Sequence, residues 1–271
     1  MIPNILSIAG SDPSGGAGFQ ADIKAISANG GYAMAVITAV IAQNTCGVQA
    51  VQLVDHTMVS AQITSIHDDI RIDAVKIGML GNAAIIEAVA EFLTTLSVPI
   101  VLDPVMVAKS GDRLLAPEIV KTLRTQLLPH ATVLTPNLPE ASDLLGVPEA
   151  KNQVEMEEQA IAILELGPGA VLLKGGHLVG GHSPDLLATP QGLIWLDDSR
   201  HPTRNTHGTG CTLSSALATQ LAHGNLLPEA AQISKNFISE AIRSADDLDV
   251  GGGSGPVHHF HSLWTKTHNL T

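Results

Sequence analysis

The residues best suited to chemistry lie in the segment Asn205-Thr-His-Gly-Thr-Gly-Cys211. Its glycines, Gly208 and Gly210, stand just before residues 212–221, whose apolar positions recur at helical spacing. Glycine lets the backbone turn tightly, and a helix N-terminus adds unpaired N–H donors and the positive end of the helix dipole. Together they predict an anion hole, suited to a phosphate or to a phosphoryl group in transfer. The same field is expected to lower the pKa of the Cys211 thiol.

The competing interpretation is a glycine-containing loop before a core helix with a small buried cysteine, because short glycine motifs often match by chance. Another match, Gly16-Ala-Gly18-Phe-Gln-Ala21, fits a loose dinucleotide fingerprint. That fingerprint needs an acidic residue after the second strand to hold the ribose, whereas Gln43-Asn44-Thr45 stands there. No Gly-Lys-Ser/Thr sequence of a Walker A loop occurs either. The choice between an anion hole and a plain glycine loop therefore depends on the rest of the chain.

Composition favours a globular protein that acts on small molecules. Of the 271 residues 45% are hydrophobic and 15% are charged, so a large core is available and global disorder is not expected. The net charge of −12 argues against non-specific binding to nucleic acid or to an anionic membrane. The two cysteines do not suggest a secreted disulfide scaffold. No Lys or Arg precedes Lys24, and no apolar run could cross a bilayer, so a soluble cytoplasmic protein is expected.

Short apolar strands alternate with amphipathic helices along the chain. Strands are expected at 5–9, 35–42, 74–77, 100–102, 132–134 and 170–173, with a hairpin of 185–189 and 193–196. Helices are expected from Phe19 to a stop at Gly30, with Phe19, Ile23 and Ile26 on one face, and at 59–69, 82–96, 117–127, 155–166, 212–221 and 229–245. The pattern predicts one α/β domain over residues 1–271, with a mainly parallel sheet covered on both faces. Residues 251–255 are expected to be a flexible connection to the tail.

Ligands of such a sheet bind beyond the carboxyl ends of its strands. The polar residues expected there are Gly10-Ser-Asp12, Gln43-Asn44, Lys76-Ile-Gly-Met79, Asp103, Asn137 with Glu140, and Lys174-Gly-Gly-His177. Two carboxylates for Mg²⁺, a lysine for phosphate charge and an anion hole are typical of a phosphotransferase.

At this point several motifs, in order along the chain, resemble one known family. They are Ile8-Ala-Gly-Ser-Asp-Pro-Ser-Gly-Gly-Ala-Gly18, Lys76-Ile-Gly-Met-Leu80, Leu102-Asp-Pro-Val-Met106, Thr135-Pro-Asn-Leu-Pro-Glu140, Lys174-Gly-Gly-His177 and Thr206-His-Gly-Thr-Gly-Cys211. The sequence is similar to the bifunctional hydroxymethylpyrimidine/phosphomethylpyrimidine kinases of thiamine biosynthesis, in the ribokinase-like superfamily. The resemblance implies a three-layer α/β/α fold and two ATP-dependent phosphorylations, of 4-amino-5-hydroxymethyl-2-methylpyrimidine and then of its monophosphate.

The resemblance also implies a role for each matching residue. It assigns catalysis to Cys211 with Gly208, Thr209 and Gly210, and pyrimidine binding to Gln43, Met79, Ala17 and Asp22. It assigns ATP binding to Lys174, Asn137 and Thr206, and Mg²⁺ to Asp103 and Glu140. Several of these residues also have an alternative role that involves no ligand. Gln43, Asp22 and Lys174 could be solvated surface residues, and Asp103 and Glu140 could be helix caps.

Other functions remain open at this stage. Sugar kinases of this superfamily usually carry Asp where Cys211 stands, so the cysteine favours a heteroaromatic alcohol and leaves pyridoxal kinase as the second candidate. A Cys–His hydrolase using Cys211 with His207 or His177 lacks a recognisable orienting residue. A non-catalytic pyrimidine-binding protein is disfavoured by the retained site residues. The tail residues 258–261 are expected to form no metal site, and the resemblance implies a homodimer.

Overall fold

The computed structural model describes residues 1–106 and 117–264. Within them, eight strands form one sheet in the order β10-β9-β8-β7-β6-β5-β1-β2, and β3 and β4 form a separate hairpin. The strands are β1 (Asn4–Ala9), β2 (Tyr32–Ile37), β3 (Ala39–Asn44), β4 (Gly47–Leu53), β5 (Ala74–Ile77), β6 (Ile100–Leu102), β7 (Val133–Leu134), β8 (Val171–Lys174), β9 (Asp185–Thr189) and β10 (Gly192–Leu196). The helices are α1 (Gly18–Ala28), α2 (His56–His67), α3 (Ala83–Leu93), α4 (Pro117–Gln126), α5 (Leu138–Leu145), α6 (Gln153–Leu164), α7 (Thr209–Ala222) and α8 (Leu227–Arg243), with 3-10 turns at Leu128–His130 and Ala245–Asp247.

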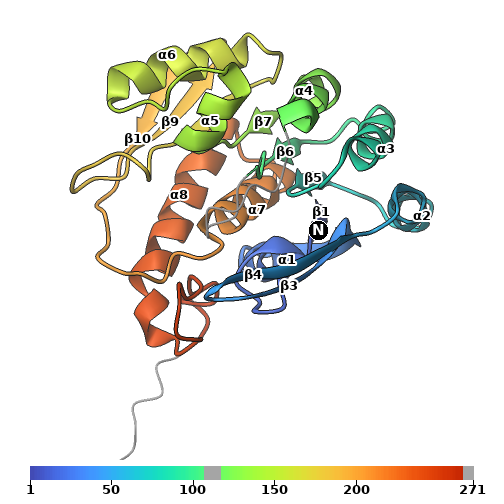
Figure 1. The fold of residues 1–271 in the computed structure, drawn as a ribbon, viewed down its shortest axis with the longest axis horizontal. Helices are drawn as coiled ribbons and strands as arrows, with labels where there is room; N and C mark the ends of the chain where they lie inside the picture. The colour runs from blue at the N-terminus through green and yellow to red at the C-terminus, as the bar shows by residue number, and fades with distance from the viewer. Residues whose placement is uncertain (107–116, 265–271) are drawn as a thin grey trace, which may run out of the picture.

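The sheet is parallel from β2 to β8; β9 pairs antiparallel with β8, and β10 pairs antiparallel with β9. Successive strand residues face two different cores, as a pleated sheet requires. In β1, Leu6 and Ile8 belong to the core under α2–α6, whereas Ile5 belongs to the core under α1, α7 and α8. Figure 1 shows these helix layers on the two faces of the sheet. This arrangement confirms the expected three-layer α/β/α fold. No helix in the described ranges is long and apolar enough to cross a membrane.

The prediction of one continuous strand over residues 35–42 is wrong, because these residues belong to two strands, β2 and β3, which are separated at Thr38. Thr38 is buried at the break, and its hydroxyl donates to the Met79 carbonyl at 2.6 Å. β2 pairs with β1 in the main sheet, whereas β3 leaves it and pairs with β4. A continuous apolar run does not reveal such a break, because both halves have the same composition. The result is a hairpin that carries Gln43 at its end.

Residues 251–255 are also not the free connection that their composition suggests. Ser254 N–H donates to the Thr45 carbonyl at 2.9 Å, and Gly255 N–H donates to Asn205 Oδ1 at 3.0 Å. A Cβ on Gly253 would lie 2.0 Å from the Thr45 carbonyl oxygen, so glycine is needed for this close approach. The run therefore ties the β3–β4 turn to the segment that precedes α7.

Candidate active site

The N-terminus of α7 lies at the segment for which the sequence predicts an anion hole. Gly208 caps the helix at φ +78°, and a Cβ there would lie 1.7 Å from the Gly16 carbonyl oxygen. Only glycine fits this position, on both conformational and steric grounds. The backbone N–H and hydroxyl of Thr209 both donate to the Thr206 carbonyl, at 3.4 and 2.7 Å. The glycine-rich loop before α1 is thereby packed directly against the first turn of α7.

An ion pair lies beside that turn. Lys174 Nζ, at the end of β8, is 2.9 Å from Asp103 Oδ1, just after β6, and Thr135 Oγ1 donates to the same oxygen at 3.2 Å. A Cβ added to Gly210 would lie 3.1 Å from Lys174 Nζ and 3.3 Å from Asp103 Oδ2. The structure therefore brings together the predicted phosphate lysine, one predicted carboxylate and the anion hole, from three elements far apart in sequence.

Glu140 has the capping role that was its alternative, and it also faces the same lysine. Its carboxylate accepts from Asn137 N–H at 2.8 Å, while Asn137 Oδ1 accepts from Glu140 N–H at 2.8 Å, which is a capping box at the start of α5. Lys174 Nζ lies 3.9 Å from Glu140 Oε2. Burial raises the pKa of Glu140 to about 7, against the opposing charge of Lys174. The side chain is thus both a structural cap and a carboxylate poised to ionise near neutral pH.

The donor set of Asp103 and Glu140 suits Mg²⁺ better than a transition metal. No group of three or more His, Cys, Asp or Glu side chains in the described parts of the chain is placed to hold a metal by itself. Mg²⁺ does not need such a cage, because it keeps several waters and is held by one or two carboxylates with the phosphates of a nucleotide. Two buried carboxylates beside a helix N-terminus fit that chemistry.

Cys211 lies in the first turn of α7, partly exposed, and the expectation of a lowered pKa is wrong. Burial of the thiol raises its pKa to about 11, although the charge of Lys76 and a hydrogen bond from the Gly18 backbone oppose the shift. The cost of desolvating a thiolate exceeds the help that it receives at the helix end. Cys211 is therefore a protonated thiol in the resting enzyme near neutral pH.

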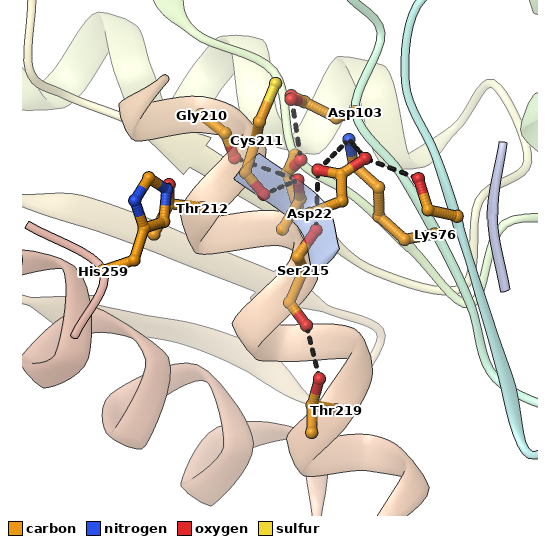
Figure 2. A network of polar contacts seen from close by, with 12 residues as sticks. Asp22, Lys76, Asp103, Gly210, Cys211, Thr212, Ser215, Thr219 and His259 are labelled. Carbon is orange, nitrogen blue, oxygen red and sulfur yellow. Dashed lines mark hydrogen bonds and ion pairs between the residues drawn. The ribbon is translucent and has the colours of Figure 1, made fainter. Parts of the chain in front are cut away.

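A buried polar network lies under Cys211 (Figure 2). Lys76 Nζ contacts both oxygens of Asp22 at 2.8 and 2.9 Å, and both side chains are fully buried. Ser215 and Ser7 donate to the same carboxylate at 2.8 and 2.6 Å. Burial alone would lower the pKa of Lys76, but the charge and hydrogen bonds of Asp22, together with the charges of Cys211 and Asp103, outweigh it and raise that pKa. Asp22 thus has its oxygens engaged beneath the site, and the expected direct contact with a pyrimidine is not supported.

The sequence places Lys76 only among the polar residues expected where ligands bind, whereas the structure buries it completely inside β5. It is the one charged residue in a strand, Ala74–Ile77, that is buried along its whole length. A lysine buried in this way needs a partner, so its presence in an apolar strand indicates a buried ion pair. The sequence pattern did not identify Asp22 as that partner.

Gln43, Ala17 and Met79 lie around the start of the glycine-rich loop. Met79 packs with Ile41 in a small apolar cluster, and a Cβ on Gly10 would lie 3.6 Å from Met79 Sδ. Ala17 N–H donates to Asp12 Oδ2 at 2.7 Å. The pairing of β3 with β4 shifts at Gln43, a bulge that redirects a side chain. These three predicted residues therefore lie near the glycine-rich loop, which in turn packs at Gly16 against Gly208 at the start of α7.

Asp12 connects these parts, a role that the sequence did not reveal. His207 Nε2 lies 2.7 Å from Asp12 Oδ2, and the Ser14 N–H and hydroxyl donate to Oδ1 at 2.9 and 2.7 Å. Burial alone would raise the pKa of Asp12, but the bonds from His207 and Ser14 outweigh it and hold that pKa well below its usual range. Because His207 Nε2 is engaged with Asp12, it is not available to Cys211 in the Cys211–His207 version of the hydrolase arrangement.

The tail packs on α7 next to the site. His258 and His259 are buried, and His259 Nε2 lies 2.9 Å from Thr212 Oγ1, one residue beyond Cys211 (Figure 2). Burial lowers the pKa of His259 to about 3, so this ring is neutral. The observed contacts give the tail a packing role against α7.

Comparison with known proteins gives a consistent set of similarities. The sequence model of a family described as "Phosphomethylpyrimidine kinase" matches residues 12–258. The chain is 52% identical over 262 residues to the hydroxymethylpyrimidine/phosphomethylpyrimidine kinase of Escherichia coli (strain K12), covering 96% of this chain and 98% of that protein.

Two solved structures are similar over most of their length. An ADP complex of Bacillus subtilis pyridoxal kinase matches with a TM-score of 0.91 at 38% identity, over 98% of this chain and 100% of that one. A phosphomethylpyrimidine kinase from Clostridium difficile 630 matches with a TM-score of 0.78 at 43% identity, over 89% and 99%. Both kinds of enzyme are kinases, and the sequence identity is higher to the pyrimidine kinases.

Proposed function

The chain belongs to the phosphomethylpyrimidine kinase family, and from this premise we propose how its residues perform the reaction. The enzyme transfers a phosphoryl group from ATP to 4-amino-5-hydroxymethyl-2-methylpyrimidine, and a second one to the resulting monophosphate, in thiamine biosynthesis. The observation that carries the assignment of roles is the placement of Gly210 against Asp103 and Lys174. A helix N-terminus, an ammonium group and a carboxylate meet where a phosphoryl group would pass.

The transfer depends mainly on positioning and charge, because its transition state is loose. The N–H groups of Gly210 and Cys211, in the first turn of α7, would hold the transferring group, and Lys174 would supply a positive charge to the ATP phosphates. Asn137 and Thr206 shape the turns that present these groups. Mg²⁺, held through Asp103 and Glu140, would neutralise phosphate charge. The substrate hydroxyl gives up its proton late, and the proposed acceptor is the thiolate form of Cys211, which is a small fraction of this residue near neutral pH.

Gln43, Met79 and Ala17 form the pyrimidine side of the site in this proposal. Gln43 offers both a donor and an acceptor to the aminopyrimidine edge. Asp22 acts from below, through Lys76 and α7, rather than by touching the ring. The whole chain, residues 1–271, works as one kinase domain, and by analogy with its family we expect a cytoplasmic homodimer.

A coupled assay for ADP release tests the substrate. The purified chain should turn over the pyrimidine alcohol and its monophosphate with a far higher kcat/KM than pyridoxal. The structural similarity to pyridoxal kinases makes pyridoxal the informative rival. A preference for pyridoxal would overturn the assignment.

Gln43→Ala should weaken binding of the pyrimidine alcohol by about 1–3 kcal/mol, because polar atoms of the ring lose their partner. The KM for ATP should barely change. Gln52→Ala, on the exposed part of β4 in the same hairpin, is the matched control and should leave both values unchanged. An equal loss for both substrates would mean that Gln43 acts on the fold rather than on the ring.

Glu140→Gln should raise the Mg²⁺ concentration needed for half-maximal rate, since a neutral amide holds Mg²⁺ or its waters less well. Asp103→Asn should act in the same direction. With a pKa of about 7 for Glu140, the wild-type requirement should also rise as the pH falls below that value, because protons compete with the ion.

Glu155→Gln is the control for capping. Glu155 accepts from the Lys151 N–H, and its own N–H donates to Asn152 at the start of α6, so it repeats the helix-cap role of Glu140 away from the site. This variant should keep the wild-type Mg²⁺ titration. Identical titrations for Glu140→Gln, Asp103→Asn and wild type would remove both carboxylates from the ion's site.

A further inference from the structure

The side chain of Arg200 ties two segments of the chain together at one edge of the sheet. Arg200 lies in the segment 197–208, which leads from β10 to α7, and it reaches the loop 175–184, which connects β8 to β9. Four of the five N–H groups of its guanidinium donate to carbonyl oxygens of that loop. The acceptors are Gly176, Leu178, Gly180 and His182, at distances of 2.9, 2.8, 3.0 and 3.3 Å. One planar fork thus gathers alternate carbonyls of the loop around itself.

The backbone joins the same two segments near the end of the loop. The Arg200 N–H donates to the Gly181 carbonyl at 2.9 Å, and the Ser183 N–H donates to the Asp198 carbonyl at 2.8 Å. The tip of the loop lies in solvent, where Val179 is fully exposed. The backbone bonds therefore hold the end of the loop, whereas the guanidinium reaches its middle.

The direction in which ATP must lie follows from the order of the strands. Phosphoryl transfer is roughly in line, so the attacking hydroxyl and the departing ADP lie on opposite sides of the phosphorus. In the sheet order β10-β9-β8-β7-β6-β5-β1-β2, the proposed pyrimidine residues Ala17 and Met79 follow β1 and β5, whereas Lys174 ends β8. ADP is therefore expected to extend from Lys174 toward β9 and β10. The connections at that edge are the loop 175–184 and the segment 197–208, the two parts that Arg200 joins.

We propose that Arg200 is a positioning residue for ATP, because its guanidinium holds the loop 175–184 in the shape that receives the nucleotide beside Lys174. This inference rests on the proposed function, in which Lys174 meets the ATP phosphates. The loop contains glycine at positions 175, 176, 180 and 181, so without this tie its backbone would sample many shapes. The binding shape would then be populated for a smaller fraction of the time, which weakens the apparent affinity for a nucleotide in proportion.

Arg200→Ala should raise the KM for ATP and the dissociation constant of ADP by about tenfold, because the loop is less often in its binding shape. The KM for the pyrimidine alcohol should stay near the wild-type value, since that substrate lies at the other end of the site. Arg200 is exposed, so the midpoint of thermal unfolding should change little and the loss cannot be assigned to unfolding. Arg243→Ala is the matched control, because it removes another exposed cation, which bonds to Glu240 on α8. It should leave both KM values unchanged.

Arg200→Lys separates the shape of the side chain from its charge. Lysine keeps the positive charge but cannot bridge several carbonyls as a planar fork, so this variant should resemble Arg200→Ala. A wild-type KM for ATP in Arg200→Lys would overturn the proposal, because the charge alone would then suffice.

Hydrogen exchange of the backbone amides in residues 176–182, measured without substrates, gives a readout that does not depend on activity. Exchange there should be faster in both Arg200 variants and unchanged in Arg243→Ala. Unchanged exchange in the Arg200 variants, or a loosened loop with wild-type affinity for ADP, would overturn the proposal. Failure of the proposed function has a different result, which is that the wild type does not turn over the pyrimidine alcohol, whatever the affinity of the Arg200 variants for ADP.

Discussion

Cys211→Ala should lower kcat by about 10²–10⁴-fold, the usual range for a positioned acid–base group. The KM values for pyrimidine and ATP should change little, because the helix N–H groups and Lys174 stay in place. The measurement is kcat per folded active site, with folding checked by thermal unfolding. A merely structural cysteine would instead give a destabilised protein whose folded fraction turns over normally. A near-wild-type kcat would remove Cys211 from catalysis.

The raised pKa of Cys211 adds a pH signature to this prediction. With a pKa of about 11, only a small fraction of the thiol is ionised at neutral pH, and that fraction rises about tenfold per pH unit. If the thiolate accepts the substrate proton and chemistry limits the rate, kcat should rise with pH between about pH 7 and pH 10. Cys211→Ala should lose this rise.

Cys211→Asp is the informative companion, because a carboxylate is already ionised at neutral pH. It imitates the residue of the sugar kinases that the family resembles, and it should recover part of the rate with a flatter pH profile. Cys46→Ala, at an exposed cysteine in the β3–β4 turn, is the control and should behave as wild type. A wild-type profile that is flat from pH 7 to pH 10 would argue that the proton leaves by another route.

Much of the fold could be predicted because periodicity is a local property. Strands Ala74–Ile77 and Ile100–Leu102 are short apolar runs between amphipathic helices, and their predicted bounds agree with the structure. The hairpin around Gln191-Gly192 was likewise recognisable from its turn. The break at Thr38 was not, since a buried threonine in an apolar run carries no turn signal.

For the candidate site, too, local features could be predicted from the sequence and long-range contacts could not. Gly208 and Gly210 could be identified from sequence because their spacing before a helix has a direct steric meaning. The environment of a side chain cannot be read in this way. The α1 pattern placed Phe19, Ile23 and Ile26 on the apolar face, yet Ala21, Asp22, Ala25 and Ile26 are the buried residues. The buried face turns toward α7 because Asp22 binds Lys76 and Ser215, contacts that span 54 and 193 residues. The error in the pKa of Cys211 has the same origin, since burial depends on segments distant in sequence.

Lys76→Met should destabilise the protein by about 3–5 kcal/mol, because it leaves the buried carboxylate of Asp22 without its cation. Methionine has a similar length and fills the space, so the loss reflects charge more than packing. Urea unfolding measures it as a shift of the midpoint at constant slope. The pKa of Lys76 is raised above its ordinary value of 10.5, so its stabilising charge is fully present below that pH and is lost only as the pH rises through the folded pKa. The difference between variant and wild type should therefore persist between about pH 6 and pH 9.

Two further variants show whether the ion pair is the cause. Arg71→Met breaks an exposed pair with Asp73 and should cost much less, because solvent screens both charges. Lys76→Met combined with Asp22→Asn removes both buried charges and should recover part of the stability, since Ser7 and Ser215 can still bond to the amide. If the double variant is as unstable as the sum of the two single ones, the charges do not interact as the geometry implies. If it is restored but still turns over slowly, the Lys76 charge also acts on Cys211 and the phosphoryl group above it.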